Sequence, residues 1–248
     1  MSPTNTLTDA SALLDQFYRV PRAGAVRLSD GGGPFGFDIT VAIQVDHLVT
    51  TLDCDGIIET GCFLGDTTEY LSRRYSHLPI RTCDIDPQAA EFTRRRLTHM
   101  GNVSVRTGDS AALIAKLARG LRRPLYYLDA HWYDQWPLHS ELATIDVGVV
   151  CIDDFDIGHA RFGYDSYHGR PCDPHFVTAA LPDLPQMWVG NPFFDYTVPC
   201  LQTGRRAGTG YLLRGLPGRI DHPMFTLVPL RPVLLPQWPD ADHDRSAP

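Results

Sequence analysis

Residues 56 to 152 alternate strictly between short apolar segments and amphipathic ones, and this alternation constrains the fold more than any other feature of the chain. The apolar segments are predicted strands: Gly56–Thr60, Ile80–Ile85, Val103–Thr107, Pro124–Leu128 and Val147–Ile152. The segments between them are predicted helices: Thr67–Tyr75, Pro87–Met100, Ser110–Leu121 and Leu138–Ile145. Right-handed crossovers then give a parallel sheet with helices on both faces. We therefore predict an α/β fold with a doubly wound, mostly parallel, Rossmann-like sheet that binds ligands at the carboxyl ends of its strands.

Two regions at the ends of the chain differ from this core. Residues 1–52 contain two predicted helices, over residues 8–19 and Ile39–Leu52, with a hinge-like break at Gly31–Pro34. We expect these residues to form an N-terminal helical cap that closes over the site as a lid. The last residues, 239–248, are predicted to be a disordered tail.

Residues 53–238 form one predicted α/β domain. After the fifth strand, residues 155–175 show no strong period and are rich in aromatic residues, histidine, glycine and proline, which indicates a long functional loop. Three later segments are predicted strands with an antiparallel edge: Met187–Val189, Tyr211–Arg214 and Phe225–Leu230.

Composition narrows the classes of partner. A net charge of −7 argues against a nucleic-acid ligand, and the basic cluster Arg94–Arg96 lies on a predicted helix as a solvated face. The six cysteines form no Cys-x-x-Cys pair, so we expect reduced, apolar fillers. Because no 18-residue apolar run and no signal peptide is found, we expect a cytoplasmic protein without a membrane partner. A homodimer is left open.

The first predicted strand leads into a glycine turn. The pattern Glu-x-Gly-x-x-x-Gly-x-Thr places Glu59, Gly61, Gly65 and Thr67 between a buried strand and a helix N-terminus. Backbone N–H groups face a ligand at such a turn, and dinucleotide enzymes have Gly-x-Gly-x-x-Gly there. We expect these four residues to line a cofactor site, although strand–glycine–helix turns also occur as plain packing devices.

Acids follow the second and third predicted strands. The carboxylate of Asp84 can accept hydrogen bonds from both ribose hydroxyls of a nucleoside, whereas Asp86 is expected to cap the helix beginning at Pro87. Asp109 or Ser110 can cap the next helix while facing an adenine amino group. The alternative is that these residues serve only as turn and cap residues.

More acids follow the fourth and fifth strands. Asp129 and His131 come after the fourth strand, and Asp153 and Asp154 after the fifth. Because these strands are neighbours, three carboxylates converge and would repel one another unless a cation such as Mg²⁺ lies between them. Such an ion would bind substrate oxygens and stabilise an attacking alkoxide or phenolate.

Taken in order, these motifs resemble those of class I S-adenosylmethionine (SAM) methyltransferases. Glu-x-Gly…Gly, Asp-Ile-Asp-Pro, Gly-Asp-Ser, Leu-Asp-Ala-His-Trp and Ile-Asp-Asp-Phe are similar to the catechol O-methyltransferase type and to metal-dependent sugar O-methyltransferases of antibiotic pathways, over residues 40–156. The resemblance implies that SAM binds through Glu59, Gly61, Asp84, Asp109 and Ser110. It implies metal ligands at Asp129, Asp153 and Asp154.

The chain departs from the catechol enzymes at two points. Those enzymes have a lysine base directly after Asp-His-Trp, whereas here one residue is inserted before His131 and Tyr133 follows the tryptophan. Their third metal ligand is an amide, where this chain has Asp154. The candidate catalytic residues are therefore His131, Asp129 and Tyr133. Three roles stay open for His131: a fourth metal ligand, a general base, or a ring that stacks near the adenine. Without a metal, Asp129 would hold the methionine amino group of SAM.

The leading hypothesis is SAM-dependent O-methylation of a small molecule of the secondary-metabolite type. Residues 132–137 and the loop from Phe155 to Phe176 supply aromatic walls with polar tips, which suit a small amphipathic substrate. Two alternatives stay open: a SAM-consuming enzyme of other chemistry, by aminocarboxypropyl transfer or cyclisation, and a SAM-binding scaffold without catalysis.

Overall fold

The computed structural model describes residues 4–23, 25, 32–131, 136–203 and 206–230. Gly31, Tyr133 and the predicted tail at 239–248 lie outside these residues. Within the described part of the chain, no helix has the length and apolar character needed to cross a membrane.

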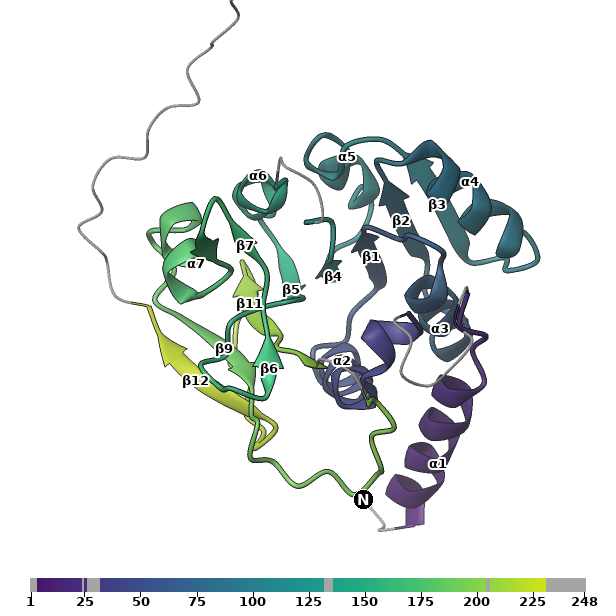
Figure 1. Ribbon diagram of the computed structural model, residues 1–248, viewed down its shortest axis with the longest axis horizontal. Helices are drawn as coiled ribbons and strands as arrows, with labels where there is room; N and C mark the ends of the chain where they lie inside the picture. The colour runs from purple at the N-terminus through teal and green to yellow at the C-terminus, as the bar shows by residue number, and fades with distance from the viewer. Residues whose placement is uncertain (1–3, 24, 26–31, 132–135, 204–205, 231–248) are drawn as a thin grey trace, which may run out of the picture.

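One eight-stranded sheet forms the centre of the molecule, in the order β12-β9-β11-β5-β4-β1-β2-β3 (Figure 1). The five strands from β3 to β5 pair in parallel, whereas β11 is antiparallel to β5 and β9, and β12 is antiparallel to β9. The strands are β1 Gly56–Thr60, β2 Ile80–Asp84, β3 Val103–Thr107, β4 Pro124–Leu128, β5 Gly148–Ile152, β9 Gln186–Gly190, β11 Gly210–Arg214 and β12 Phe225–Pro229. The predicted doubly wound, mostly parallel sheet with an antiparallel edge is confirmed.

Helices cover both faces of this sheet. They are α1 Thr4–Tyr18, η1 Pro34–Phe37, α2 Ile39–Thr51, α3 Asp66–Arg74, α4 Pro87–Arg96, α5 Ser110–Leu117, α6 Leu138–Thr144 and α7 Pro174–Ala180. One face packs in a core with α1, α2 and α3, and the other in a core with α5, α6 and α7. Tyr127 belongs to the first core and Leu128 to the second, as side-chain alternation along a strand requires.

The chain reverses its direction across the sheet between β1 and β4. From β1 it proceeds to β2 and β3 on one side, and then returns to β4 and β5 on the other. The helices that follow β1 and β4 therefore diverge to opposite faces and leave a crevice at the carboxyl ends of these two strands, where ligands of such sheets bind. The candidate residues lie at this edge.

Several element boundaries differ from the sequence predictions. Helix α4 ends at Arg96 rather than Met100. Helix α5 ends at Leu117 rather than Leu121, because the chain turns before Gly120, whose φ of +83° is left-handed. The segment 155–175 is not structureless: it contains the short strands β6 Phe162–Gly163, β7 Ser166–Tyr167 and β8 Arg170–Pro171. All six cysteines are free, and Cys62, Cys83 and Cys151 are buried, as expected.

Candidate functional site

The turn after β1 needs glycine at two positions. Gly61 has a φ of +79° and Gly65 a φ of +80°, both in the left-handed region that favours glycine. A Cβ atom at Gly61 would lie 2.3 Å from the carbonyl oxygen of Asp129, so this turn sits directly against the end of β4. The Gly61 N–H donates to the Cys83 carbonyl (2.9 Å), which ties the turn to β2.

The start of α3 holds the N-terminal segment in place. Thr67 accepts a hydrogen bond at Oγ1 from the Phe35 N–H (3.0 Å), and Asp66 accepts one at Oδ2 from the Gly33 N–H (2.7 Å). The Phe35 ring in turn lies 4.9 Å from the ring of Tyr127, over the end of β4. The predicted cofactor residue Thr67 thus anchors η1, and the anchoring role of Asp66 had no signal in the sequence beyond its place in the motif.

Glu59 lies beneath the turn rather than on its open side. Its carboxylate is fully buried and accepts a hydrogen bond from the Thr68 hydroxyl (2.5 Å). Burial raises the pKa of Glu59 to about 7, with these hydroxyl contacts opposing the shift. Its role toward a cofactor stays a prediction.

Asp84 lies at the end of β2, half-buried, and organises the turn. Its Oδ2 accepts a hydrogen bond from the Phe63 N–H (2.7 Å), and its Oδ1 accepts one from the Asp86 N–H (2.9 Å). Asp86 caps α4 by accepting from the Gln88 N–H (2.8 Å), as predicted. Each Asp84 oxygen keeps a further lone pair, so the carboxylate can both order the turn and accept from a ligand.

The two candidates after β3 differ in surroundings. Asp109 caps α5 by accepting from the Ala111 N–H (3.0 Å), which leaves its adenine role untested. Ser110 is buried beside Glu141 of α6, a residue that the sequence did not single out. Burial raises the pKa of Glu141 to about 7, and the hydroxyls of Ser110 and Thr60 oppose this shift.

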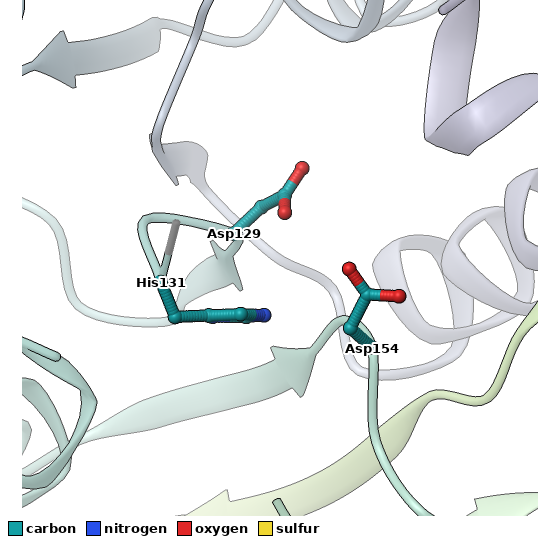
Figure 2. Close-up of side chains that lie close together, drawn as sticks. All are labelled: Asp129, His131 and Asp154. Carbon is teal, nitrogen blue, oxygen red and sulfur yellow. The ribbon is translucent and has the colours of Figure 1, made fainter. Parts of the chain in front are cut away.

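Three candidate metal ligands meet at the ends of β4 and β5. One ligand atom each from Asp129, His131 and Asp154 lies within 4.8 Å of the other two (Figure 2). The His131 ring extends toward the gap between the two carboxylates, which come from neighbouring strand ends (Figure 2). Asp154 has a φ of +47°, so the chain leaves β5 in a left-handed turn that directs this side chain.

Asp153 is buried next to this group but is not one of its three members. Burial raises the pKa of Asp129 well above its usual range, and the charges of Asp153 and Asp154 raise it further. The pKa of Asp153 is also raised, first by burial and then by Asp154. Carboxyl groups packed in this way ionise together only if positive charge is placed among them.

His131 is buried with only 3% of its surface exposed. Both of its ring nitrogens lack a hydrogen-bond partner within the described part of the chain, and burial lowers its pKa to about 4, so the ring is neutral at pH 7. The Oδ2 atom of Asp165 lies 4.0 Å from Nε2, too far for a hydrogen bond. Asp165 is a site residue that the sequence located only within the predicted functional loop.

An aromatic wall stands beside His131. The Trp136 ring lies 5.3 Å from the His131 ring and stacks at 5.5 Å on Tyr167, and Phe176 meets it edge-on at 5.9 Å. Trp188 of β9 is not part of this wall and packs in the core with α1, α2 and α3.

Comparisons with known proteins give likenesses at low identity. No family model and no curated protein matches the chain. The cofactor-bound protein Rv0187 from MTB is 17% identical, with a TM-score of 0.48 over 84% of this chain and 90% of that one. The O-methyltransferase from Bacillus cereus in complex with SAH is 16% identical, with a TM-score of 0.48 over 86% and 92%. The O-methyltransferase TomG from Streptomyces achromogenes, solved with SAM, is 20% identical, with a TM-score of 0.45 over 69% and 78%.

Proposed function

We propose that this chain is a SAM-dependent methyltransferase that methylates a hydroxyl group of a small molecule at a divalent-metal site. The observation that carries the proposal is the group of Asp129, His131 and Asp154, which lies at the carboxyl edge of the sheet against the Gly61 turn. A nucleoside cofactor at the glycine turn and a metal ion at the strand ends would thus be adjacent, because the backbone of Gly61 lies against the backbone of Asp129.

The cofactor part of the proposal rests on the residues around Asp84. Asp84 retains acceptor capacity for ribose hydroxyls. Phe63, whose N–H donates to Asp84, and Ile85, which follows Asp84 in the chain, leave 65% and 57% of their surfaces exposed. Large apolar side chains at the rim of a crevice are typical of surfaces that a ligand covers.

The residues at the strand ends fit a divalent cation. His131 offers a neutral imidazole whose two buried nitrogens are unpartnered in the described residues, and the carboxyls of Asp129 and Asp154 face it. Carboxylates suit Mg²⁺ and Mn²⁺, whereas an imidazole favours first-row transition metals, so we expect Mn²⁺ to bind more tightly than Mg²⁺. When bound, such an ion supplies positive charge that makes a substrate hydroxyl easier to ionise.

The chain's own residues would then orient the substrate and exclude water. Methyl transfer from a sulfonium needs alignment of the reacting groups more than covalent help. Trp136, Tyr167 and Phe176 form a wall on one side of the site, and Phe35 covers the end of β4. If no metal binds, the neutral His131 ring is the group placed to accept the hydroxyl proton.

Metal titration with the full chain tests the proposal. Mn²⁺ binding, followed by electron paramagnetic resonance and calorimetry, should be lost or weakened at least about tenfold in His131→Ala and Asp154→Asn. His175→Ala, at an exposed histidine of α7, is the matched control and should bind as the wild type does. Asp153→Asn should weaken binding less than Asp154→Asn.

Product analysis separates the functions. Turnover with candidate hydroxylated substrates should release S-adenosylhomocysteine and should stop when a chelator is added. Methylthioadenosine as the product would identify aminocarboxypropyl transfer or cyclisation instead. Wild-type protein that binds no metal and is unaffected by chelator would refute the metal site.

A further inference from the structure

A cavity of about 140 Å³ lies at the same edge of the sheet as Asp129, His131 and Asp154. Its polar and charged lining includes Thr40, Gln44, Asn191, Arg161, Arg206 and Thr209. Gly210 of β11 pairs with Ile152 of β5, so the preceding residue, Thr209, lies beside Asp153. Ile152 also pairs with Leu128 of β4, so Asp153 lies beside Asp129. Two strand spacings, about 10 Å, therefore separate the backbone of the cavity wall from that of Asp129.

Hydrogen bonds join the cavity wall to the chain just after β5. The Phe155 N–H donates to the Gly208 carbonyl (2.9 Å), and the Asp165 N–H donates to the Asp154 carbonyl (2.9 Å). β10 (Arg206–Ala207) pairs with β6, which carries Phe162 and follows Arg161. Backbone hydrogen bonds among three segments, residues 154–155, 162–165 and 206–208, thus connect the cavity wall to Asp154.

Two arginines meet around one aromatic ring in this cavity. The guanidinium carbon of Arg206 lies 4.9 Å from the centre of the Phe162 ring, and that of Arg161 lies 5.8 Å from it. Arg206 is neutralised by Asp38, which accepts from its Nε (2.7 Å) and its Nη2 (3.1 Å). Arg161 is exposed at the mouth of the cavity, donates to the Pro192 carbonyl (2.8 Å) and forms no ion pair with any described residue. Among the described residues, the mouth of the cavity therefore carries one exposed guanidinium that no acid neutralises, in a chain of net charge −7.

The rest of the lining offers a hydroxyl donor near this charge. Thr209 is 3% exposed, and its hydroxyl makes no hydrogen bond of ordinary length within the described residues. Gln44 is already engaged, since its amide nitrogen donates to the Tyr196 hydroxyl (2.7 Å) and its amide oxygen accepts from Tyr211. A buried hydroxyl and a guanidinium without an acidic partner are groups that an anionic ligand would satisfy.

We infer that this cavity binds the carboxylate of the substrate, so that the substrate is a small organic acid whose hydroxyl group reaches the Asp129 and Asp154 side chains. This inference rests on the proposed function for the position of the reacting hydroxyl. A single uncompensated charge matches a carboxylate better than a phosphate group, which carries nearly two charges at pH 7. The ring of Phe162 provides an apolar contact for the body of such an acid.

Calorimetry with a matched pair of probes tests the inference. The probes are 3-(3,4-dihydroxyphenyl)propanoate and its uncharged carboxamide, each titrated into the full chain. The wild type should bind the acid at least about tenfold more tightly than the carboxamide, because a charge-assisted hydrogen bond is lost in the latter. Arg161→Gln should reduce this preference to below about threefold, and Thr209→Val should reduce it in part.

The matched control is Arg122→Gln, at a strongly exposed arginine just before β4, at the opposite end of that strand. It should keep the full preference for the acid. Equal affinity for the two probes, no measurable binding of the acid, or an unchanged preference in Arg161→Gln would each overturn the inference. Binding is measured without SAM, so an acid-binding chain that releases no S-adenosylhomocysteine would refute the proposed function and leave the carboxylate site standing.

Discussion

Replacing Gly61 with alanine tests whether the glycine turn is in rigid contact with the candidate metal site formed by Asp129, His131 and Asp154. The new Cβ atom would lie 2.3 Å from the carbonyl oxygen of Asp129, about 1 Å closer than normal contact. The turn and the end of β4 would have to separate, and this movement displaces the Asp129 side chain. We therefore expect one substitution to weaken both SAM binding and metal binding.

The loss of folding stability in Gly61→Ala has two causes, backbone strain and steric overlap. A φ of +79° adds about 1–2 kcal/mol of strain for alanine, offset by about 0.4–1 kcal/mol from the lower entropy of the unfolded chain. The overlap with the Asp129 carbonyl adds about 1–3 kcal/mol, as other overpacked sites do. The free energy of unfolding should thus fall by about 1–5 kcal/mol.

A matched substitution at Gly120 separates the backbone strain from the steric overlap. Its φ of +83° equals that of Gly61 within a few degrees, but a Cβ atom there would meet nothing within 4 Å. Gly120→Ala should therefore show the strain alone, about 1 kcal/mol or less, with normal ligand binding. Urea denaturation gives the stabilities, and calorimetry gives the SAM and Mn²⁺ affinities. Equal destabilisation by the two substitutions, or intact Mn²⁺ binding by folded Gly61→Ala, would refute the reasoning.

Two further predictions concern a buried acid, Glu141, and a half-buried one, Asp84. Because burial raises the pKa of Glu141 from 4.5 to about 7, the folded chain holds a proton that the unfolded chain releases, so the free energy of unfolding should fall by about 3 kcal/mol as the pH rises from 4.5 to 7. Urea denaturation across this range should show a smaller fall for Glu141→Gln, and an equal fall would contradict the assignment. Asp84→Ala should weaken SAM binding by about 1–3 kcal/mol in calorimetry, whereas Asp86→Ala, which removes only the α4 cap, should not. Equal SAM affinity in wild type and Asp84→Ala would remove Asp84 from the cofactor site.

Local patterns were enough to predict the sheet and its helices. The alternation of apolar strands with amphipathic helices predicts the parallel core, because the spacing of apolar residues within each element shows which of its faces is buried. The bounds of β1, β3 and β4 agree with the sequence prediction residue for residue. Helix ends were less predictable, since leaving a helix depends on whether a glycine such as Gly120 takes up a left-handed conformation.

Roles within the candidate site were predicted less completely, because they depend on contacts between distant segments. Thr67 was predicted to line the cofactor site, yet its hydroxyl and the neighbouring Asp66 carboxylate accept from backbone N–H groups more than thirty residues earlier. The arginine pair around Phe162 could not be foreseen, since Arg161 and Arg206 meet only through the pairing of β6 with β10. Sequence spacing does not encode such pairings.

The inserted residue before His131 explains why an imidazole joins the acids. In the resembled catechol enzymes, the histidine directly follows the aspartate, whereas Ala130 separates the two here. Side chains of an extended chain alternate between its two sides, so residues that are neighbours point apart, and residues two apart point the same way. Asp129 and His131 are two apart, and they do meet at one group with Asp154. The inserted residue thus accompanies a nitrogen donor beside the two carboxyls of the candidate metal site, which is why we expect a metal preference different from that of an all-oxygen site.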